Sequence, residues 1–418
     1  MIRVFKFGGA SVKDAAGVRN VEKIISSFDT KEIVIVLSAM GKMTNALEQL
    51  TTAYFNQNNE IETHLEIIKT YHYSIINELF EDKKNKVYDE INNKFIELEW
   101  ILEDAPTETY EYLYDQIVST GEYLSSLIVS HYLNLKNIVN TWVDVRDLIR
   151  TDNNYREGHV DIETSQTQIN TLLPKILNTQ LVITQGFLGG TSENYCTTLG
   201  REGSDYSAAI FSNLLDAQSM TVWKDVIGVM NADPRYFDFA KLLPQLSYQE
   251  AIEMTYYGAT VIHPKTIKPI QNKNIPLYVR SFIDLNEQGT VIGETTKIEY
   301  PPIVVQKKNQ ILASISTNNF SFMNEKNLLL IYQIFTLHKI HINTCQQSAL
   351  TFSMCFDTDA MKLAGLIKEL KLHFNVLLNH DVTLLTIRHY TNEIVEEFTK
   401  NKHLLLEQLT RSTVQMVY

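Results

Sequence analysis

The segment Val182–Ile210, VITQGFLGGTSENYCTTLGREGSDYSAAI, joins a short apolar run to a series of glycines and then to an alanine-rich stretch. Leu181–Ile183 form the apolar run, and Gly186, Gly189 and Gly190 break it. An apolar run of this length that ends in glycines is typical of a buried strand followed by a turn. The segment therefore predicts a strand, a polar tip and then a loop that opens a helix.

The loop before that helix, Thr197–Asp205, carries hydroxyls, glycines, one arginine and a carboxylate, and the helix is predicted from Tyr206 onward. Backbone N–H groups at a helix start favour anions, and glycine lets the backbone approach a phosphate closely. Arg201 has the planar fork that binds a carboxylate, and Asp205 can orient a lysine or hold a metal. The alternative is an ordinary strand–turn–helix in which Ser204 or Asp205 is the N-cap.

The N-terminus repeats this strand–glycine–helix pattern. Ile2–Phe7 is predicted to be a buried strand, Gly8 and Gly9 end it, and Ser11 can cap the helix that follows. A lysine in an apolar strand is costly unless an anion accompanies it. Because Lys6 lies just before the glycines, we interpret it as a phosphate ligand; the alternative is an edge-strand lysine that faces water.

A second buried strand, Glu32–Leu37, leads into a loop that contains Ser38 and Thr44. Parallel α/β sheets bind ligands at the carboxyl ends of their strands, so both hydroxyls are candidate ligands as well as candidate loop and cap residues. Residues 45–135 show the three-and-four spacing of apolar residues that predicts helices. Within them, Glu122 follows a short break and is either a helix-start acid or a site carboxylate.

Strands and helices continue to alternate up to about residue 300. The predicted elements are a strand at Val139–Val145, a helix at 162–178, a strand at Met220–Val229 with Asp225 near its end, a helix at Gln249–Tyr257 and a strand at Ile275–Phe282. This alternation predicts a largely parallel, helix-covered α/β sheet.

The pattern changes near Pro301 and Pro302, which we interpret as a linker. The predicted elements beyond it are strand Ile311–Ser316, helix Leu328–Leu337, strands His341–Thr344 and Thr351–Asp357, helix Met361–Leu370, strand Val382–Arg388, helix Glu393–Lys400 and strand Thr413–Val417. The order β-α-β-β-α is typical of a ferredoxin-like unit. We predict two related small modules, the second truncated or completed by a strand that precedes the first.

The composition argues against several function classes. The 418 residues are 44% hydrophobic and 21% charged, which is typical of a globular protein of more than one domain. The formal net charge of -12 argues against a nucleic-acid surface, and no apolar run is long enough for a signal peptide or a membrane span. Three cysteines form no paired framework, so a reducing cytoplasm is the expected location.

Familiar catalytic signatures are absent from the sequence. It has no GxxxxGK[ST] loop, no HRD or DFG set and no GxSxG elbow. His338, His341 and Cys345 lack a second ligand pair, and we interpret them as packing residues rather than metal ligands.

Several motifs resemble, in order, those of one family, the aspartate kinases (aspartokinases). They are KFGGASV at 6–12, TTLGREGSD at 197–205, WKDVIGV at 223–229, ADPR at 232–235, GA at 258–259, HP at 263–264 and NIP at 274–276. One such motif would be weak evidence, but the set in this order and at suitable spacing is strongly specific, and the resemblance covers essentially the whole chain.

The resemblance implies a three-layer amino-acid-kinase sandwich (carbamate-kinase-like) with a largely parallel sheet, followed by paired ferredoxin-like βαββαβ ACT domains. The catalytic domain would span residues 1–295 and the regulatory region 303–418. Two ACT modules would cover about 311–380 and 382–418, the second with a strand from about 303–310. Paired ACT domains usually join across subunits, so a homodimer is expected.

The resemblance also implies transfer of the ATP γ-phosphate to the side-chain carboxylate of L-aspartate with Mg²⁺, the first step of lysine, threonine and methionine biosynthesis. The implied catalytic residues are Lys6 and Asp205. The implied aspartate-binding residues are Ser38, Thr44, Glu122, Phe187, Arg201 and Ser204. The implied nucleotide-binding residues are Lys6, Gly8, Gly9, Ser11, Lys224, Asp225, Met230 and Arg235, and no protein residue is expected to hold a metal.

This sequence departs from the family pattern in the catalytic region. Glu202 replaces a usual glycine, Lys224 a usual threonine or serine, Ile227 a usual aspartate, and Thr260 a lysine that reaches the nucleotide in many members. A carboxylate nucleophile needs charge neutralisation and positioning rather than a base. Since the glycine framework and the residues for this chemistry remain, activity is expected.

The regulatory region departs further. Asn343 stands where lysine-sensitive members have an aspartate that meets the inhibitor's ammonium groups, and Ala349 replaces a nearby glutamate. Losing two carboxylates weakens binding of a cationic effector. We therefore expect an enzyme that is insensitive to lysine or that responds to another amino acid.

Two other functions are compatible with these motifs. One is a catalytically weak amino-acid sensor on the same fold, and the other is a related amino-acid kinase with another acyl acceptor. The retained Lys6, Arg201 and Asp205 argue against the sensor, and Glu122 and the C-terminal modules argue against the other kinase. Because the chain ends after the small modules, a monofunctional kinase is expected rather than one fused to a dehydrogenase.

Overall fold

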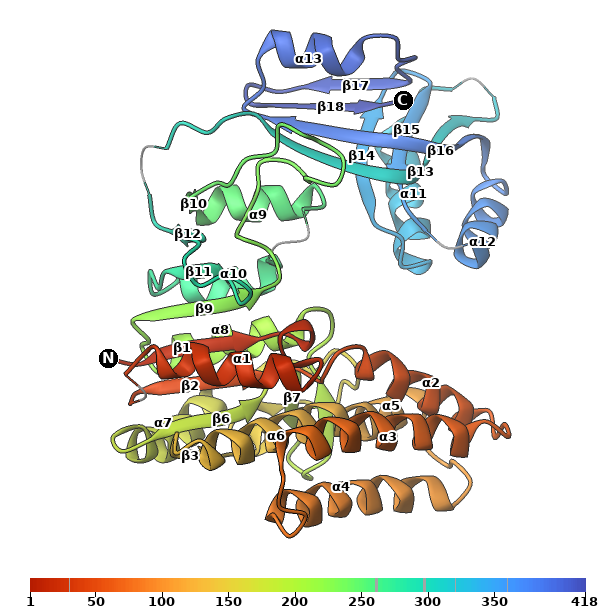
Figure 1. The fold of residues 1–418 in the computed structure, drawn as a ribbon. Helices are drawn as coiled ribbons and strands as arrows, with labels where there is room; N and C mark the ends of the chain where they lie inside the picture. Colours follow the sequence, from red (N-terminus) through yellow and green to blue (C-terminus); the bar gives the residue numbers. More distant parts are fainter. Residues whose placement is uncertain (30, 260–261, 296–297, 320, 359) are drawn as a thin grey trace. The chain divides into compact units, whose positions relative to one another are not determined.

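The computed structural model describes residues 1–29, 31–259, 262–295, 298–319, 321–358 and 360–418. The chain forms two compact units (Figure 1). The first comprises Met1–Val229, Leu242–Ile252 and Val261–Thr296; the second comprises Met230–Lys241, Glu253–Thr260 and Lys297–Tyr418. Thr260, one of the departures noted in the sequence, lies outside the described residues.

The first unit is built on a sheet in the order β10-β12-β11-β9-β1-β2-β6-β3. Its strands are β1 (Arg3–Phe7), β2 (Ile33–Leu37), β3 (Asn140–Trp142), β6 (Leu181–Gln185), β9 (Ser219–Lys224), β10 (Gln245–Ser247), β11 (Leu277–Ser281) and β12 (Thr290–Gly293). Among these described strands only the β11–β12 pair is antiparallel. The largely parallel α/β sheet predicted from the sequence is therefore confirmed.

A smaller sheet in the same unit has the order β5-β4-β7-β8. It consists of β4 (Arg150–Thr151), β5 (Val160–Asp161), β7 (Leu188–Gly190) and β8 (Cys196–Thr198). The hairpin β7–β8 places Leu188 opposite Thr198 and Gly190 opposite Cys196. This hairpin is the polar tip expected between the strand and the helix of the segment that opens at Val182.

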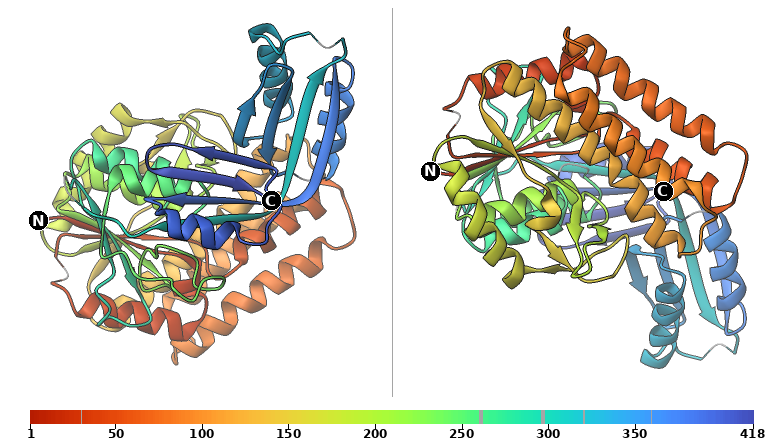
Figure 2. Two further views of the ribbon diagram at one scale, coloured as in Figure 1. Left: turned by 90° about the horizontal axis from the view of Figure 1, so that it is seen from above. Right: turned by 90° about the horizontal axis from the view of Figure 1, so that it is seen from below.

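Helices cover both faces of the large sheet (Figure 2). Those of the first unit are α1 (Ala15–Ser26), α2 (Met43–Phe55), α3 (Ile61–Leu79), α4 (Lys86–Glu103), α5 (Tyr110–Val118), α6 (Thr120–Leu135), α7 (Ile162–Leu177), α8 (Gly203–Leu214), α10 (Pro264–Gln271) and the first half of α9 (Tyr248–Tyr256), with short 3₁₀ turns at Gly9–Val12 and Val145–Asp147. α8 packs on β1, β2 and β9, while α6 packs on β2, β3 and β6. Successive side chains of a strand point to opposite faces of the sheet, so each strand contributes to the layers on both sides. On one face, Phe5, Phe7 and Ile35 pack with α1 and α6 in one apolar core.

The second unit contains an antiparallel sheet in the order β14-β15-β13-β16-β18-β17. Its elements are β13 (Ile303–Thr317), α11 (Glu325–Leu337), β14 (Ile342–Gln347), β15 (Thr351–Phe356), α12 (Ala360–Leu370), β16 (Phe374–Arg388), α13 (Asn392–Thr399), β17 (Leu406–Leu409) and β18 (Thr413–Val417). The long strands β13 and β16 pair along their whole lengths, so Ile303–Lys307 lie beside Leu384–Arg388. The antiparallel sheet with its helices agrees with the predicted ACT-type fold.

Some local predictions were wrong. The N-cap of α1 is Asp14, whose side chain accepts from the Gly17 amide, whereas Ser11 lies in the preceding 3₁₀ turn. α8 begins earlier than predicted, at Gly203, and its N-cap position is Glu202 in the left-handed region with no side-chain cap, rather than Ser204 or Asp205.

Strand lengths were also misjudged in places. The strand predicted at Val139–Val145 is only Asn140–Trp142, because Val145 enters a 3₁₀ turn. The strand predicted at Met220–Val229 ends at Lys224, and β17 was not predicted from the sequence. Its sequence, LEQL, is half polar and short, so it carries no clear strand pattern.

Candidate functional site

The carboxyl ends of the central parallel strands lie at one edge of the large sheet. Phe7 of β1 lies opposite Leu37 of β2 and Trp223 of β9, and Leu37 lies opposite Gln185 of β6. The four loops that leave these strands therefore start side by side. In parallel sheets this edge is the usual place for ligands, as the sequence predicted.

Lys6 points toward α8. Its neighbours in β1, Phe5 and Phe7, belong to the apolar core under α1 and α6, and successive side chains on a strand face opposite ways. The Lys6 side chain is only 11% exposed, so its ammonium group requires an anionic partner inside the protein.

That partner is Asp205, in the first turn of α8. Lys6 Nζ lies 2.6 Å from Asp205 Oδ1, and Lys224 Nζ from the end of β9 lies 3.8 Å from Asp205 Oδ2. Burial alone would raise the pKa of Asp205, but the two ammonium groups outweigh it and hold that pKa below its ordinary value. A carboxylate at a helix N-terminus is stabilised further by the helix dipole. Two lysines thus converge on one ionised aspartate at the ligand edge of the sheet.

Glycines allow the loops at this edge to approach each other closely. A Cβ on Gly9 would lie 2.7 Å from the carbonyl oxygens of Ala39 and Gly41, and a Cβ on Gly186 would lie 2.6 Å from the Cβ of Ser204. Backbone atoms cannot move aside cheaply, so both positions require glycine. The loop after β1 is therefore fixed against the loop after β2. In the same way, the loop after β6 is fixed against the start of helix α8.

Glu122 lies in the first turn of α6, behind the loop that follows β2. Its Oε1 accepts a hydrogen bond of 3.2 Å from the Ala39 amide, and no donor among the described residues reaches its buried Oε2. Burial raises the pKa of Glu122 to about 8, and the Ala39 amide only partly opposes this. A buried carboxylate with an unpartnered oxygen fits either a retained proton or a cationic group of a ligand.

The remaining predicted aspartate ligands surround the same edge. Ser38 and Thr44 lie in the loop after β2 and the first turn of α2, and Ser204 lies in the first turn of α8. Phe187 has a left-handed backbone (φ 70°), and its amide is held by Ser207 Oγ at 3.0 Å. Arg201 is exposed in the loop before α8.

The predicted nucleotide ligands are divided between the two units. Ser11 is buried, and its Oγ donates to the Trp223 carbonyl oxygen at 3.4 Å. Asp225 is exposed just after β9 in the first unit. Met230 and Arg235 belong to the second unit, where the Arg235 guanidinium pairs with Asp233 at 2.7 Å.

Sequence reasoning missed Lys265 in the first turn of α10. Its Nζ donates to the Leu199 carbonyl oxygen at 2.9 Å and lies 4.8 Å from the centre of the Tyr206 ring. Burial lowers the pKa of Lys265. No local sequence pattern distinguished Lys265, because its contacts depend on the packing of α10 against α8. These two helices are far apart in the sequence.

A mostly parallel sheet whose ligand edge gathers glycine loops, a helix start and two lysines defines a class of protein, the phosphate-handling α/β enzymes. Residues 1–281 match the model of the amino acid kinase family. The chain is 32% identical over 369 residues to lysine-sensitive aspartokinase 3 of Escherichia coli (strain K12), covering 87% of this chain and 80% of that protein.

Other comparisons agree. A bifunctional aspartokinase/homoserine dehydrogenase of Buchnera aphidicola is 34% identical over 301 residues, which are 70% of this chain and 36% of that protein. E. coli aspartokinase III with lysine and aspartate superposes with a TM-score of 0.85 at 27% identity, over 100% of this chain and 96% of that one. The same enzyme with aspartate and ADP gives a TM-score of 0.84 at 28% identity, with the same coverage. The chain belongs to the amino acid kinase family and, within it, to the aspartate kinases.

The described residues contain neither a membrane-spanning helix nor a metal-binding cluster. None of their helices is long and apolar enough to cross a membrane. No group of three or more histidine, cysteine, aspartate or glutamate side chains among them is arranged to hold a metal ion. His338, one of the three residues considered for a metal site, is paired with Glu369 at 2.8 Å.

The raised pKa of Glu122 makes a prediction about stability. Because its folded-state pKa of about 8 lies above the ordinary value of 4.5, the folded state binds the proton more tightly, and stability falls as pH rises from about 4.5 to about 8. Glu122→Gln removes this titration. We expect the difference in Tm, Glu122→Gln minus wild type, to increase over that pH range and to level off above it; a difference independent of pH would contradict the assignment.

Proposed function

We propose that this aspartate kinase transfers the γ-phosphoryl group of ATP to the side-chain carboxylate of L-aspartate, giving 4-phospho-L-aspartate. The observation that carries the proposal is the buried ion pair between Lys6 and Asp205 at the ligand edge of the sheet. The relationship to aspartokinases, one of which was solved with aspartate and ADP, supports the choice of substrates.

The reaction needs no general base. A carboxylate oxygen of aspartate forms a bond to the γ-phosphorus while the bond from that phosphorus to the bridging oxygen breaks, and ADP leaves with the electron pair. The obstacle is repulsion between two anions, which cationic groups and backbone N–H groups relieve. Lys6 is the residue to stabilise the transferring group, because Asp205 holds its ammonium at the strand end.

ATP binds as its magnesium complex. Mg²⁺ usually reaches such sites through substrate phosphates and waters, so it is part of the substrate here. Asp205 is already engaged by Lys6 and Lys224, which makes it a poor metal ligand. The groups proposed to hold the nucleotide are Lys6, the backbone of Gly8 and Gly9, Ser11, Lys224, Asp225, Met230 and Arg235.

Aspartate is proposed to bind between the loops after β2 and β6 and the start of α8. Arg201 would take the α-carboxylate, because its fork matches a carboxylate. Glu122 would meet the ammonium group, since its Oε2 is buried and lacks a donor among the described residues. The other proposed ligands are Ser38, Thr44, Phe187 and Ser204.

We also propose the domain assignment that follows from this function. Residues 1–295 form the catalytic domain, and 303–418 form two ACT modules that bind an amino-acid effector. A homodimer is proposed, which light scattering distinguishes from a monomer. A cytoplasmic location is proposed because Cys196, Cys345 and Cys355 are all free thiols; fractionation of cells tests it.

Replacing Lys6 tests the catalytic assignment. We expect Lys6→Met to lower kcat about 10²- to 10³-fold, as loss of one transition-state donor does elsewhere, with a small change in KM for aspartate. Acyl phosphate is trapped with hydroxylamine, with L-glutamate as the comparison substrate. The exposed Lys13, in Lys13→Met, is the control and should keep wild-type kcat. Equal losses in the two variants would contradict the role of Lys6, and a folded wild type without aspartate-dependent turnover would favour the sensor function.

We also propose that the enzyme is insensitive to lysine or responds to another amino acid, and contacts in the second unit support this proposal. Asn343 is buried; its Oδ1 accepts from Lys307 Nζ at 2.7 Å, and its Nδ2 donates to Gln310 Oε1 at 2.7 Å. A neutral amide already bonded to an ammonium of the same chain is a weaker partner for a second ammonium than a carboxylate is.

We therefore expect lysine to inhibit wild type weakly and Asn343→Asp to lower the lysine concentration for half inhibition by about tenfold. Steady-state assays with lysine, threonine and methionine measure this. Asn375→Asp, an exposed change in β16, is the control for added negative charge. Strong inhibition of wild type by low lysine concentrations would overturn the proposal.

A further inference from the structure

The strand β8 (Cys196–Thr198) lies at the edge of its sheet and leads directly into the loop that carries Arg201, and Ser204 follows in the first turn of α8. One side of β8 pairs with β7. Backbone groups on the other side are buried and require partners from elsewhere in the protein.

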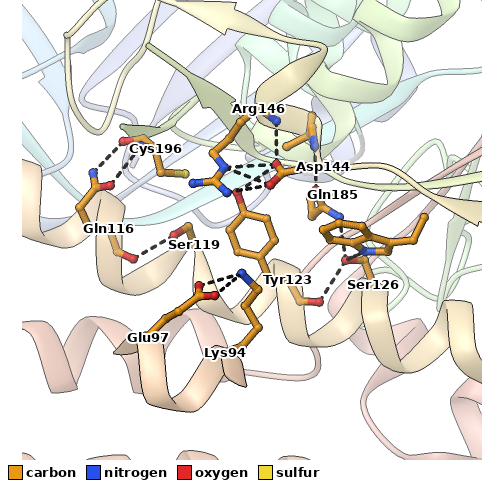
Figure 3. Close-up of polar contacts among 12 residues, drawn as sticks. Lys94, Glu97, Gln116, Ser119, Tyr123, Ser126, Asp144, Arg146, Gln185 and Cys196 are labelled. Atoms are coloured by element: carbon orange, nitrogen blue, oxygen red, sulfur yellow. Dashed lines mark hydrogen bonds and ion pairs between the residues drawn. The ribbon is translucent and has the colours of Figure 1, made fainter. Parts of the chain in front are cut away.

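Two adjacent side chains of α5, Asp115 and Gln116, supply most of these partners. The Gln116 amide brackets Cys196: its Nε2 donates to the carbonyl oxygen at 2.8 Å, and its Oε1 accepts from the amide at 3.1 Å (Figure 3). Asp115 accepts from the Thr198 amide at 2.9 Å and from the Thr198 hydroxyl at 2.7 Å. Together they take the place of a further strand along β8.

Asp115 also holds a third segment of the chain. Its Oδ2 accepts from the Arg156 amide at 2.9 Å, and Arg156 lies in a turn with a left-handed backbone (φ 69°). The same turn returns to β8, because the Gly158 amide donates to the Thr198 carbonyl oxygen at 2.9 Å. One carboxylate therefore joins α5, the turn at Arg156 and the end of β8.

The hydrogen bonds that Asp115 accepts are strengthened by its negative charge. Asp115 is fully buried, and burial raises its pKa to about 6, while the hydrogen bonds from Arg156 and Thr198 oppose this rise. It is therefore mostly ionised at neutral pH, and hydrogen bonds to an ionised acceptor are about twice as strong as neutral ones.

The position of Thr198 affects the residues that follow it. The Leu199 amide is held by the Phe187 carbonyl oxygen at 2.8 Å, and Gly200 turns the chain with φ 74°. Arg201 comes next, and its side chain is exposed, so its location depends on the backbone that leads to it. A misplacement of about 1 Å in a substrate-binding group can lower a rate about 10²-fold.

We propose that Asp115 is a positioning residue for aspartate binding. By fixing Thr198 and the turn at Arg156, it holds Arg201 and Ser204 at the ligand edge of the sheet. Being fully buried, it acts through these residues rather than on the substrate. The inference rests on the proposed role of Arg201 and Ser204 in binding aspartate.

Two substitutions separate geometry from charge. Asp115→Ala removes all three hydrogen bonds. Asp115→Asn keeps an oxygen for the two backbone amides, and its amide can donate to the Thr198 hydroxyl, which also accepts. We expect Asp115→Ala to raise KM for aspartate about tenfold or more while KM for MgATP stays within about twofold, and Asp115→Asn to restore KM for aspartate to near the wild-type value.

The matched control is Asn140→Ala. Asn140 is also buried and forms three side-chain hydrogen bonds, with Ser130 and the Ile138 carbonyl, but it lies at the start of β3, away from the ligand edge. We expect it to lower Tm without changing KM for aspartate. If it raises KM as Asp115→Ala does, or if Asp115→Ala raises both KM values equally, Asp115 has only a structural role.

Hydrogen exchange gives a readout that does not depend on turnover. Amides of residues 196–204 should exchange faster in Asp115→Ala than in wild type and return to wild-type rates in Asp115→Asn. Unchanged exchange in Asp115→Ala would overturn the inference even in an active enzyme. If Asp115→Ala exchanges faster but the wild-type protein shows no aspartate-dependent turnover, the positioning role of Asp115 stands and the proposed function is overturned. If Asp115→Ala does not fold, Thr198→Val serves in its place, because it removes only the hydrogen bond from the Thr198 hydroxyl to Asp115. It should raise amide exchange and KM for aspartate by less than Asp115→Ala would. No change in either quantity would contradict the proposal.

Discussion

The ion pair between Lys6 and Asp205 is the constraint on which the ligand edge of this protein depends. A lysine in the middle of a parallel sheet is tolerated only if a carboxylate reaches it, and that carboxylate comes from a helix about 200 positions later in the chain. The pairing requires β1 to be a central strand and α8 to pack on the face of β1 from which Lys6 projects. It also requires the loop before α8 to end where Asp205 is level with Lys6. Removing Asp205 would leave Lys6 as a buried charge without its partner, and removing Lys6 would leave Asp205 with only the more distant Lys224.

The surrounding features satisfy these requirements step by step. Gly186 lets the end of β6 approach Ser204, and the side chains of α5 hold β8, so the loop between them has fixed ends. The electrostatics differ between the two sides of this edge. Lys6 and Lys224 meet at Asp205, whereas Glu122 is a buried carboxylate whose Oε2 has no donor among the described residues. A phosphorylated nucleotide suits the first side, and the ammonium group of an amino acid suits the second.

Local sequence patterns were sufficient for much of this structure. The strands at β1, β2 and β6, the glycines after them and the antiparallel C-terminal sheet follow from apolar periodicity and turn residues, which act over a few positions. The candidate site followed from lysine and glycine at a strand end. The predictions that failed had two causes: local backbone conformations that the pattern does not show, and contacts between distant segments. Asp14 rather than Ser11 caps α1, because the intervening 3₁₀ turn displaces the helix start. Glu202 at the start of α8 adopts a left-handed backbone, which its residue type does not predict because residues other than glycine rarely adopt it. Asp115 and Lys265 gave no signal, since their partners lie about 83 and 66 positions away.

The central claim is that a side-chain carboxylate oxygen of aspartate attacks the γ-phosphorus of ATP at the edge organised by Lys6 and Asp205. The direct measurement uses L-aspartate with isotopically heavy oxygen in its side-chain carboxylate and follows the phosphate released by hydroxylamine with phosphorus NMR. Hydroxylamine attacks the acyl carbon, so the bridging oxygen leaves with phosphorus. Heavy oxygen in the released phosphate in wild type, and far less such phosphate per unit time in Lys6→Met, is the result predicted. Released phosphate without heavy oxygen would mean that water is the acceptor and would contradict the account.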